Sequence, residues 1–319
     1  MTPDRAKTLL LLGTTRCGST IIEHVLGNID GFFAAGEIHM MWRGLRRGFR
    51  CGCGEPLTRC TIWSRVLATA LSGSSFDADE IERWRLAEVR MMHTPRLLML
   101  QDRPETGRAA LDRYLSLLAR LYPAIATVTG ARVIVDSSKT PAVGALLARL
   151  AEVDLYVLHV VRDPRGVAHS WRRGRPSTDG GAQQRTYSPG SFRTAGRWIA
   201  TNALAEALRR RLPPGRSMMV RYEDFATTPK DVVRRIATFV GEGDARLPFV
   251  DERTASLQPT HTVSGNRSRF RTGPVELRLD DEWRNDPILP RAIVTGIAMP
   301  LLPRYGYPAF PAISPTPSR

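Results

Sequence analysis

The chain has 319 residues, of which 42% are hydrophobic and 24% are charged, a composition typical of a folded globular protein with a sizeable core. Its formal net charge of +15 favours polyanionic partners. An arginine-rich, lysine-poor composition often reflects genome base composition, and this explains much of the excess of basic over acidic residues. Four leucines at 9–12 are too few for a signal peptide, no segment approaches a membrane span, and the four cysteines form no obvious disulfide framework, so we expect a cytoplasmic protein without a transmembrane segment.

Segments with strand and helix character alternate along most of the chain. The expected strands are residues 9–12, 31–37, 132–136, 155–161 and 218–221. One expected helix directly follows the first strand. Four further helices are expected at residues 141–150, 162–171, 191–211 and 231–240. This alternation predicts an α/β fold, in which a parallel sheet is flanked by helices on both faces.

Three stretches depart from this alternation. Residues 40–130 hold no clear parallel strand and are predicted to form a mainly helical insertion, in which Asp77 caps a helix. Residues 174–190 are predicted to be a flexible polar link. Residues 308–319 contain five prolines among twelve residues and are predicted to be a disordered tail, which leaves residues 1–307 as a single domain.

The most informative motif, GTTRCGST at residues 13–20, follows the first strand. A strand, a glycine-containing loop and a helix N-terminus together bind phosphate, because free backbone N–H groups and the helix dipole converge on the anion. A loop that hydrolyses ATP or GTP has Gly-Lys-Ser/Thr at its end. This chain has Gly18-Ser19-Thr20 there and carries its cation earlier, at Arg16. The loop is therefore predicted to bind a phosphate outside ATP or GTP chemistry.

A second motif, VRDPRGVAHS at residues 161–170, follows the longest apolar run. Together with RCGST at 16–20, it resembles the sulfotransferases that use 3′-phosphoadenosine 5′-phosphosulfate (PAPS). In that family the first motif binds the 5′-phosphosulfate, and an arginine and a serine eight residues later bind the 3′-phosphate; here they are Arg162 and Ser170. This is physically sensible, because arginine offers a planar fork to phosphate oxygens and a hydroxyl along the helix reaches the same group.

Two later segments extend the resemblance. VRYEDF at 220–225 is similar to a family segment whose tyrosine, here Tyr222, lies near the adenine. SGNRSRF at 264–270 is similar to a late loop whose basic residues close over the cofactor. The resemblance implies a P-loop nucleoside-kinase-like sulfotransferase fold, with the insertion lining the acceptor pocket. It covers residues 8–38, 131–172, 216–240 and 259–307.

The resemblance implies a set of PAPS-binding residues, with two departures inside the first motif. Most relatives have serine at the position of Cys17, so a hydroxyl donor is lost while the backbone N–H groups remain. Arg16 replaces the lysine of the cytosolic small-molecule branch and resembles the carbohydrate, tyrosylprotein and glycolipid branches. The implied residues are Arg16, Cys17, Gly18, Ser19, Thr20, Arg162, Ser170, Tyr222, Asn266, Arg267 and Arg269.

Sulfonate transfer to a hydroxyl or amine needs a base for the acceptor proton and cations for the developing charge. Glu37 resembles the base of the protein-tyrosine and glycolipid branches; His39 is the alternative base, and a structural or substrate-orienting role for Glu37 is the other alternative. Lys139 resembles the catalytic lysine that contacts the sulfonate, and Arg16 is the cation beside the departing 5′-phosphate. The implied reaction is a direct in-line displacement that yields 3′-phosphoadenosine 5′-phosphate (PAP) and requires no metal.

Cys51, Cys53 and Cys60 form the most ambiguous feature. A structural zinc site uses four ligands, and this Cys-x-Cys with one further cysteine has no histidine nearby in the sequence to complete a set. A packed or occasionally oxidised loop near the acceptor pocket is favoured over a metal site, and no metal ligand is assigned. His261 is a candidate for a cofactor or acceptor contact.

Two other classes of function remain as alternatives. A P-loop kinase or NTPase would need the missing lysine, and a non-enzymatic binder of polyanions or nucleic acid would show interleaved aromatic and basic residues, whereas aromatic residues make up 7% of the chain. The expected partner is a sugar, glycolipid or natural-product acceptor, with no specific nucleic acid. The sequence sets neither the acceptor nor the oligomeric state.

Overall fold

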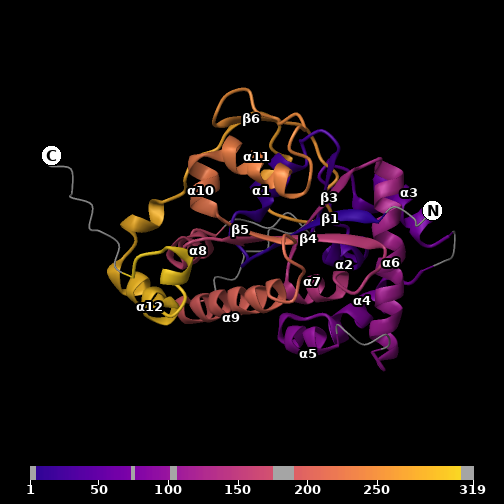
Figure 1. Ribbon diagram of the computed structural model, residues 1–319, viewed down its shortest axis with the longest axis horizontal. Coiled ribbons are helices and arrows are strands. Elements are labelled where there is room, and N and C mark those ends of the chain that lie inside the picture. Colours follow the sequence, from indigo (N-terminus) through magenta and orange to yellow (C-terminus); the bar gives the residue numbers. More distant parts are fainter. Residues whose placement is uncertain (1–4, 73–75, 101–105, 175–189, 310–319) are drawn as a thin grey trace.

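The computed structural model describes residues 5–72, 76–100, 106–174 and 190–309. Within them a parallel sheet crosses the middle of the molecule in the order β2-β3-β1-β4-β5 (Figure 1). Its strands are β1 (Ala6–Leu12), β2 (Phe32–Gly36), β3 (Val133–Lys139), β4 (Val153–Val161) and β5 (Ser217–Arg221). The predicted α/β fold is therefore confirmed, and the carboxyl ends of all these strands meet at one edge of the sheet, where ligands bind in such folds.

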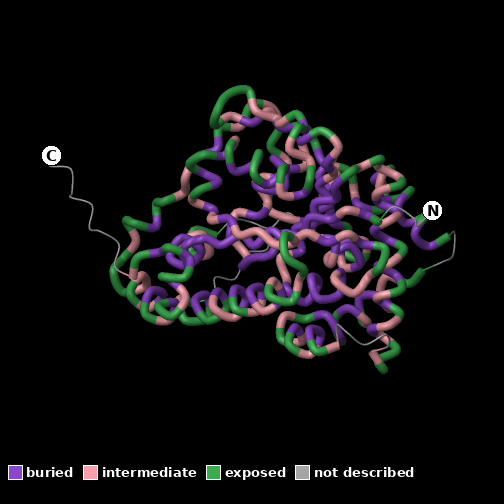
Figure 2. The backbone as a smooth tube through the Cα atoms, viewed as in Figure 1, coloured by how far each residue is buried: buried purple, intermediate pink, exposed green. Residues whose placement is uncertain are grey.

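β1 is the central strand, and its side chains divide the core into two layers. Leu9 and Leu11 pack into the cluster on one face, and Leu10 and Leu12 pack into the cluster on the other. This follows from the two-residue period of a strand, which sends alternate side chains to opposite faces. A continuous apolar run is thus what a strand buried on both faces requires. Figure 2 shows many of the buried residues in the middle of the molecule.

Helices cover both faces of the sheet (Figure 1). On one face lie α1 (Ser19–Leu26), α10 (Tyr222–Thr227) and α11 (Pro229–Phe239). On the other face lie α7 (Pro141–Leu147) and the long α9 (Ser191–Arg209). The helix α8 (Pro164–Arg172) leaves the carboxyl end of β4, and α12 (Ile288–Ala298) packs against both α8 and α9.

The insertion between β2 and β3 is helical, as predicted. Its described residues form η1 (Ile38–Met40), α2 (Met41–Arg47), η2 (Leu57–Arg59), α3 (Thr61–Ala70), α4 (Ala78–Glu88), η3 (Met91–His93), α5 (Thr94–Met99) and α6 (Ala109–Thr129). The long helix α6 packs against α3 and α4 and reaches the sheet at β1, β3 and β4. The predicted cap is also confirmed, since the Asp77 carboxylate accepts from the backbone N–H of Asp79 at 2.7 Å.

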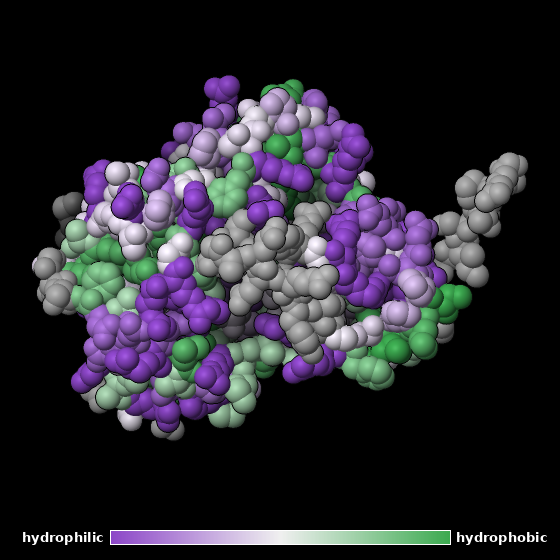
Figure 3. Space-filling model, turned by 180° about the vertical axis from the view of Figure 1, so that it is seen from behind, coloured by the Kyte–Doolittle hydropathy of each residue, from purple (hydrophilic) through white to green (hydrophobic). Residues whose placement is uncertain are grey.

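The last part of the described chain contains elements that the sequence did not predict. An antiparallel pair, β6 (Thr254–Leu257) and β7 (Gly273–Glu276), is followed by η5 (Glu282–Asn285), and η6 (Pro303–Tyr305) follows α12. Residues 175–189, which make up most of the predicted flexible link, and 310–319 of the predicted tail lie outside the described residues. No described helix is long and apolar enough to span a bilayer. Figure 3 shows hydrophilic residues over much of the described surface on the side opposite to Figure 1.

Candidate functional site

The loop at residues 13–20 joins β1 to α1 at the carboxyl edge of the sheet. Gly18 is the N-cap of α1 with φ of 94°, and a Cβ there would lie 2.4 Å from Cδ2 of Tyr222. Glycine is thus required both by the left-handed backbone and by the tyrosine ring that packs on the loop. The first turn of a helix presents backbone N–H groups that its own hydrogen bonds do not use. This end of α1 is therefore able to hold an anion.

Arg16 and Lys139 are two of the described non-glycine residues with positive φ, at 76° and 65°. Such a backbone conformation is strained for an L-residue and collects at functional sites. Both residues lie at the carboxyl edge of the sheet, and the Gly13 backbone N–H donates to the Lys139 carbonyl at 3.2 Å. The guanidinium of Arg16 also lies over the Trp171 ring, 4.9 Å from its centroid. The fold therefore points two cations into one region from adjacent strands.

Glu37 and Lys139 form an ion pair in the cavity, because Glu37 directly follows β2 and Lys139 ends the neighbouring strand β3. The Lys139 ammonium also donates to the Ser137 carbonyl at 3.2 Å. His39, the alternative base, is not among the described residues that line the cavity, and its backbone N–H donates to the Ser138 hydroxyl at 3.3 Å. Burial holds the pKa of His39 well below its usual value.

A buried carboxyl group lies behind this pair. Glu23 of α1 accepts from the Gly36 backbone N–H and from the Ser137 hydroxyl, each at 2.6 Å. Burial raises the pKa of Glu23 to about 8, although both hydrogen bonds act against that shift. Glu23 thus ties together the ends of β2 and β3, the strands that carry Glu37 and Lys139.

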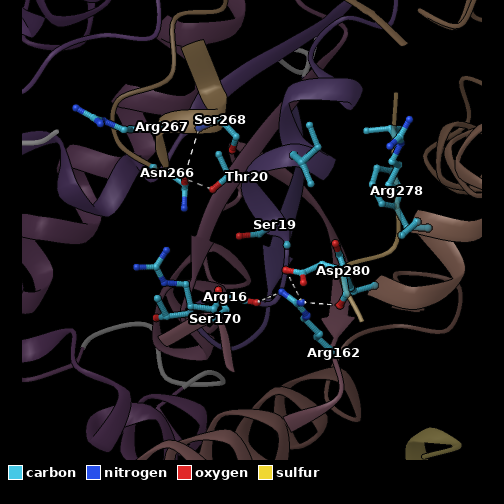
Figure 4. Close-up of a pocket in the computed structure, with 18 of the residues that line it drawn as sticks. Arg16, Ser19, Thr20, Arg162, Ser170, Asn266, Arg267, Ser268, Arg278 and Asp280 are labelled. Atoms are coloured by element: carbon cyan, nitrogen blue, oxygen red, sulfur yellow. Dashed lines mark hydrogen bonds and ion pairs between the residues drawn. The ribbon is translucent and has the colours of Figure 1, made fainter. Parts of the chain in front are cut away.

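Arg162 lies at the end of β4 with its side chain 6% exposed. Its guanidinium donates to the Arg16 carbonyl at 3.2 Å, pairs with the Asp280 carboxylate at 3.1 Å and lies 4.4 Å from the Tyr222 ring centroid (Figure 4). Asp280 also pairs with Arg173 at 3.0 Å. Burial alone would raise the pKa of Asp280, but the charge and hydrogen bond of Arg162, together with the charges of Arg173 and His169, outweigh burial, so that this pKa is lowered.

The late loop reaches across to α1. The Asn266 backbone N–H donates to the Thr20 hydroxyl at 3.4 Å, and the Asn266 side chain accepts from the Ser268 backbone N–H at 3.3 Å (Figure 4). The second bond caps η4 (Arg267–Phe270) and fixes the start of that turn. Figure 4 shows Arg267 and Asn266 on the side of the cavity opposite to Arg162.

These elements enclose a cavity of about 660 Å³. It brings together most of the sequence-predicted site residues: Arg16, Gly18, Ser19, Thr20, Glu37, Lys139, Arg162, Ser170, Tyr222, Asn266 and Arg267. No described residue between 40 and 130 lines it, so the predicted role of the insertion in an acceptor pocket stays a prediction.

Two predicted residues lie behind the cavity wall. The side chain of Cys17 is fully buried in the hydrophobic cluster under α1 and does not line the cavity. Arg269 is 1% exposed and donates to the Gly265 carbonyl at 3.0 Å and to the Arg50 carbonyl at 2.8 Å. Its guanidinium therefore holds the late loop against the insertion, and the cofactor contact that the resemblance implies for Arg269 stays a prediction.

Several charged residues of the cavity were not singled out from the sequence: Arg173, Arg271, Arg278, Asp280 and Glu282. Arg173 follows the second motif by three residues, and Arg271 follows the late loop directly, so wider windows around both motifs would have found them. Arg278, Asp280 and Glu282 follow β7, and no local pattern marks that segment.

Comparison with known proteins agrees with this architecture. A family model described as "Sulfotransferase family" matches residues 9–244. The sulfotransferase domain from the curacin biosynthetic pathway matches with 17% identity and a TM-score of 0.51, covering 96% of this chain and 99% of that domain. The sulfotransferase domain of the Synechococcus PCC 7002 olefin synthase matches with 17% identity and a TM-score of 0.50, and the match covers 96% of this chain and 97% of that domain. A search of the curated proteins gave no match.

At this identity the solved structures establish the fold, and the family model spans more than half of the chain. The loop at residues 13–20 and the strands β2 to β5 lie within the residues that the family model matches. The chain belongs to the sulfotransferase family and is a sulfotransferase enzyme.

Proposed function

We propose that the sulfonate donor is PAPS and that this cavity binds it. The observation that carries the proposal is that Arg162 and Ser170, at the end of β4 and on α8, line the same cavity as the loop at 13–20. ATP carries its phosphates only at the 5′ position, so a site for ATP needs one set of phosphate-binding groups. Two separate sets of phosphate-binding groups suit a nucleotide that carries phosphates at both the 5′ and 3′ positions.

In this proposal each element of the cavity has one task. The N-terminus of α1 with Ser19 and Thr20 holds the 5′-phosphosulfate, and Arg162 with Ser170 holds the 3′-phosphate. Tyr222 packs beside the adenine, and Asn266 with Arg267 closes the open side. Cys17 and Arg269 act from behind the wall, by packing under the loop and by anchoring the late loop.

The chemistry of transfer is assigned to the ion pair. Glu37 takes the proton of an acceptor hydroxyl while the hydroxyl oxygen forms a bond to the sulfur of PAPS. At the same time the bond from sulfur to the 5′-phosphate oxygen breaks, and PAP leaves. Lys139 and Arg16 stabilise the negative charge that develops on the sulfonate and phosphate oxygens. Glu37 is preferred over His39 because Glu37 lines the cavity beside Lys139. The acceptor class that the branch resemblance favours is a sugar, glycolipid or natural-product hydroxyl.

A binding comparison tests the donor. PAP and adenosine 5′-monophosphate differ only in the 3′-phosphate, so isothermal titration should give a much lower Kd for PAP in the wild type. Arg162→Ala should remove most of that preference, by about tenfold or more, because a charged hydrogen-bonding partner of the 3′-phosphate is lost. Arg172→Ala is the matched control, since Arg172 lies exposed on the neighbouring helix α8 and pairs with Asp286.

Equal affinity of the wild type for PAP and the monophosphate would refute the donor assignment. Turnover of ATP with Mg²⁺, or tight binding of nucleic acid without any response to PAP, would favour the kinase or polyanion-binding alternatives.

A further inference from the structure

A cluster of four metal-ligating side chains lies outside the donor cavity. Cys51, Cys53 and Cys60 come from the start of the insertion, and His261 comes from the loop that follows β6. One ligand atom from each residue lies within 4.8 Å of the other three. The sequence places no histidine near these cysteines, but the fold supplies one from about 200 residues away. The incomplete set expected from the sequence is thus a complete set of three thiols and one imidazole.

The distances in this cluster fit a tetrahedral metal. His261 Nδ1 lies 3.3 Å from Cys60 Sγ and 3.8 Å from Cys51 Sγ, and Cys53 Sγ lies 4.0 Å from Cys60 Sγ. Around a zinc ion with Zn–S of about 2.3 Å and Zn–N of about 2.0–2.1 Å, neighbouring ligand atoms lie roughly 3.5–3.8 Å apart. These three distances therefore differ by only a few tenths of an ångström from those around one ion, and each of the other three is at most 4.8 Å.

The two loops that carry the ligands are held together by contacts that involve no metal. The Gly52 backbone N–H donates to the Thr262 carbonyl at 2.9 Å, and the Trp63 indole donates to the His261 carbonyl at 2.5 Å. The His261 ring is also stacked on Phe33, with centroids 6.5 Å apart and planes at 15°. The imidazole is thus oriented by packing, which is what a preformed ligand requires.

The turn that carries the first two cysteines is also built for close approach. The Cys51 N–H donates to the Glu55 carbonyl, and the Gly54 N–H donates back to the Cys51 carbonyl, at 2.8 and 2.9 Å. A Cβ at Gly52 would lie 2.5 Å from the Thr262 hydroxyl, so only glycine lets this turn approach the loop of His261.

A disulfide explains the cluster less well. The four cysteines of the chain are free, and the 4.0 Å between Cys53 and Cys60 sulfurs is about twice a disulfide bond length. A disulfide would also use two of the three thiols and leave the third thiol and His261 without a function. A single metal ion uses all four side chains.

We propose that Cys51, Cys53, Cys60 and His261 bind one structural zinc ion. Three thiolates and an imidazole are soft and borderline ligands of the kind that select zinc, and they fill all four tetrahedral positions. Cys51 and Cys60 are 0% and 1% exposed and Cys53 and His261 are half-buried, so four protein ligands leave no coordination position for a water or substrate. The site is therefore closed and structural, and it takes no part in sulfonate transfer.

The position of the site gives the ion a task. Val263, two residues after His261, donates its backbone N–H to the Ala35 carbonyl at 3.0 Å, and the late loop with Asn266 follows directly. The ion thus joins the start of the insertion to the loop around His261. That loop pairs with β2 through Val263 and continues into the late loop, which lines the donor cavity. Loss of zinc should loosen the late loop and weaken PAP binding, an effect that rests on the proposed donor, whereas zinc binding itself does not.

Metal analysis of the full-length protein tests the proposal. Protein purified under reducing conditions and then exposed to equimolar zinc should hold about one zinc per chain by mass spectrometry after buffer exchange. Cys60→Ser and His261→Ala should each lower this content severalfold. Cys17→Ser is the matched control, because it removes the cysteine that lies outside the cluster, and it should keep a full equivalent.

A pair of variants at His261 separates ligation from packing. His261→Cys removes the ring but restores a fourth soft ligand, so it should retain zinc. His261→Phe keeps an aromatic ring against Phe33 but offers no ligand, so it should lose zinc. Cobalt added to the metal-free wild type should give the absorption of a tetrahedral thiolate site, and His261→Phe should not.

The proposal is overturned by wild-type protein that holds no zinc after reconstitution, or by His261→Phe that keeps wild-type content. If a variant does not fold, a chelator titration of the wild type decides the same point, because release of one zinc together with exposure of three thiols is expected only from this site. Normal zinc content with no PAP binding would refute the donor and leave the metal site standing.

Discussion

At the scale of single residues, the ion pair between Glu37 and Lys139 joins two groups with different demands. In the proposed mechanism Glu37 has to lie near the acceptor proton, and Lys139 has to lie near the sulfonate. The pair holds both side chains in place before the substrates arrive, and the positive φ of Lys139 shows that the backbone is strained to do so.

Glu37→Gln should lower turnover by about 10²–10⁴-fold, because general-base catalysis is lost while the side chain keeps its size. The Kd for PAP should stay within about twofold, since Glu37 acts on the acceptor. Labelled sulfonate transfer and titration with PAP measure the two quantities. Glu152→Gln, an exposed change before β4, is the control. Turnover near that of the wild type would end the assignment of Glu37 as the base.

Lys139→Gly should be more stable than Lys139→Ala by about 1 kcal/mol, because glycine adopts the φ of 65° without strain. Both variants should lose most of their turnover, since neither carries the ammonium. Urea unfolding gives the stability difference. An alanine variant as stable as the glycine variant would show that the backbone is not strained at this position.

At the scale of elements, the ends of β2 and β3 form one wall of the cavity, which Glu37 and Lys139 line. Gly36 ends β2 with φ of 82°, donates to Glu23 and turns the chain so that Glu37 faces the cavity. A Cβ at Gly36 would lie 2.4 Å from the Val263 backbone nitrogen. The strand end, the helix α1 and the segment after β6 are therefore packed around a position with no room for a side chain.

Gly36→Ala should be clearly more destabilising than Gly48→Ala. Both positions have positive φ, at 82° and 66°, so both carry the backbone penalty of about 1 kcal/mol. Only Gly36 adds a clash, because a Cβ at Gly48 meets nothing within 4 Å. Denaturant unfolding of the two variants measures the difference. Equal losses would mean that the segment at Val263 moves away without cost.

The sequence predicted the parts of the site that follow from local patterns. Each predicted strand end in the sheet is where an apolar run meets polar residues, as at Arg162 after β4, and these boundaries depend on neighbouring residues alone. The contacts that it missed depend on segments distant in sequence. Nothing in the sequence around Glu23 distinguishes it from an exposed glutamate on a helix, and only the packing of α1 on the sheet buries it. His261 and Asp280 are brought to their partners by turns around β6 and β7 that carry little local signal.

At the scale of the whole molecule, a fully buried acidic group makes the stability of the fold depend on pH. Glu23 has a pKa of about 8 in the folded protein, above the ordinary value of 4.5. Between these two values the folded protein holds a proton that the unfolded chain has released. The free energy of unfolding therefore falls as the pH rises through this window.

Glu23→Gln should flatten this dependence, because the amide stays neutral at every pH and still accepts from the Gly36 N–H. The difference between wild type and variant should change by about 1.4 kcal/mol per pH unit inside the window. Chemical unfolding of both proteins at several pH values from about 5 to 8 measures the free energy of unfolding as a function of pH. Parallel profiles would show that Glu23 is ionised in the folded protein.

The central position of β1 has a consequence for how the chain is made. β1 pairs with β3 and β4, so that Thr8 lies opposite Ile134 and Leu155 in the finished sheet. During synthesis at about 5–20 residues per second, the first strand thus waits for roughly ten seconds before either neighbour has emerged. For that time its apolar run has no sheet to join, and a chain interrupted before β3 leaves the strand that leads into the loop at residues 13–20 exposed to aggregation. Of the strands in this sheet, β1 is translated first, but it gains both of its neighbours, β3 and β4, only after β2 has been made.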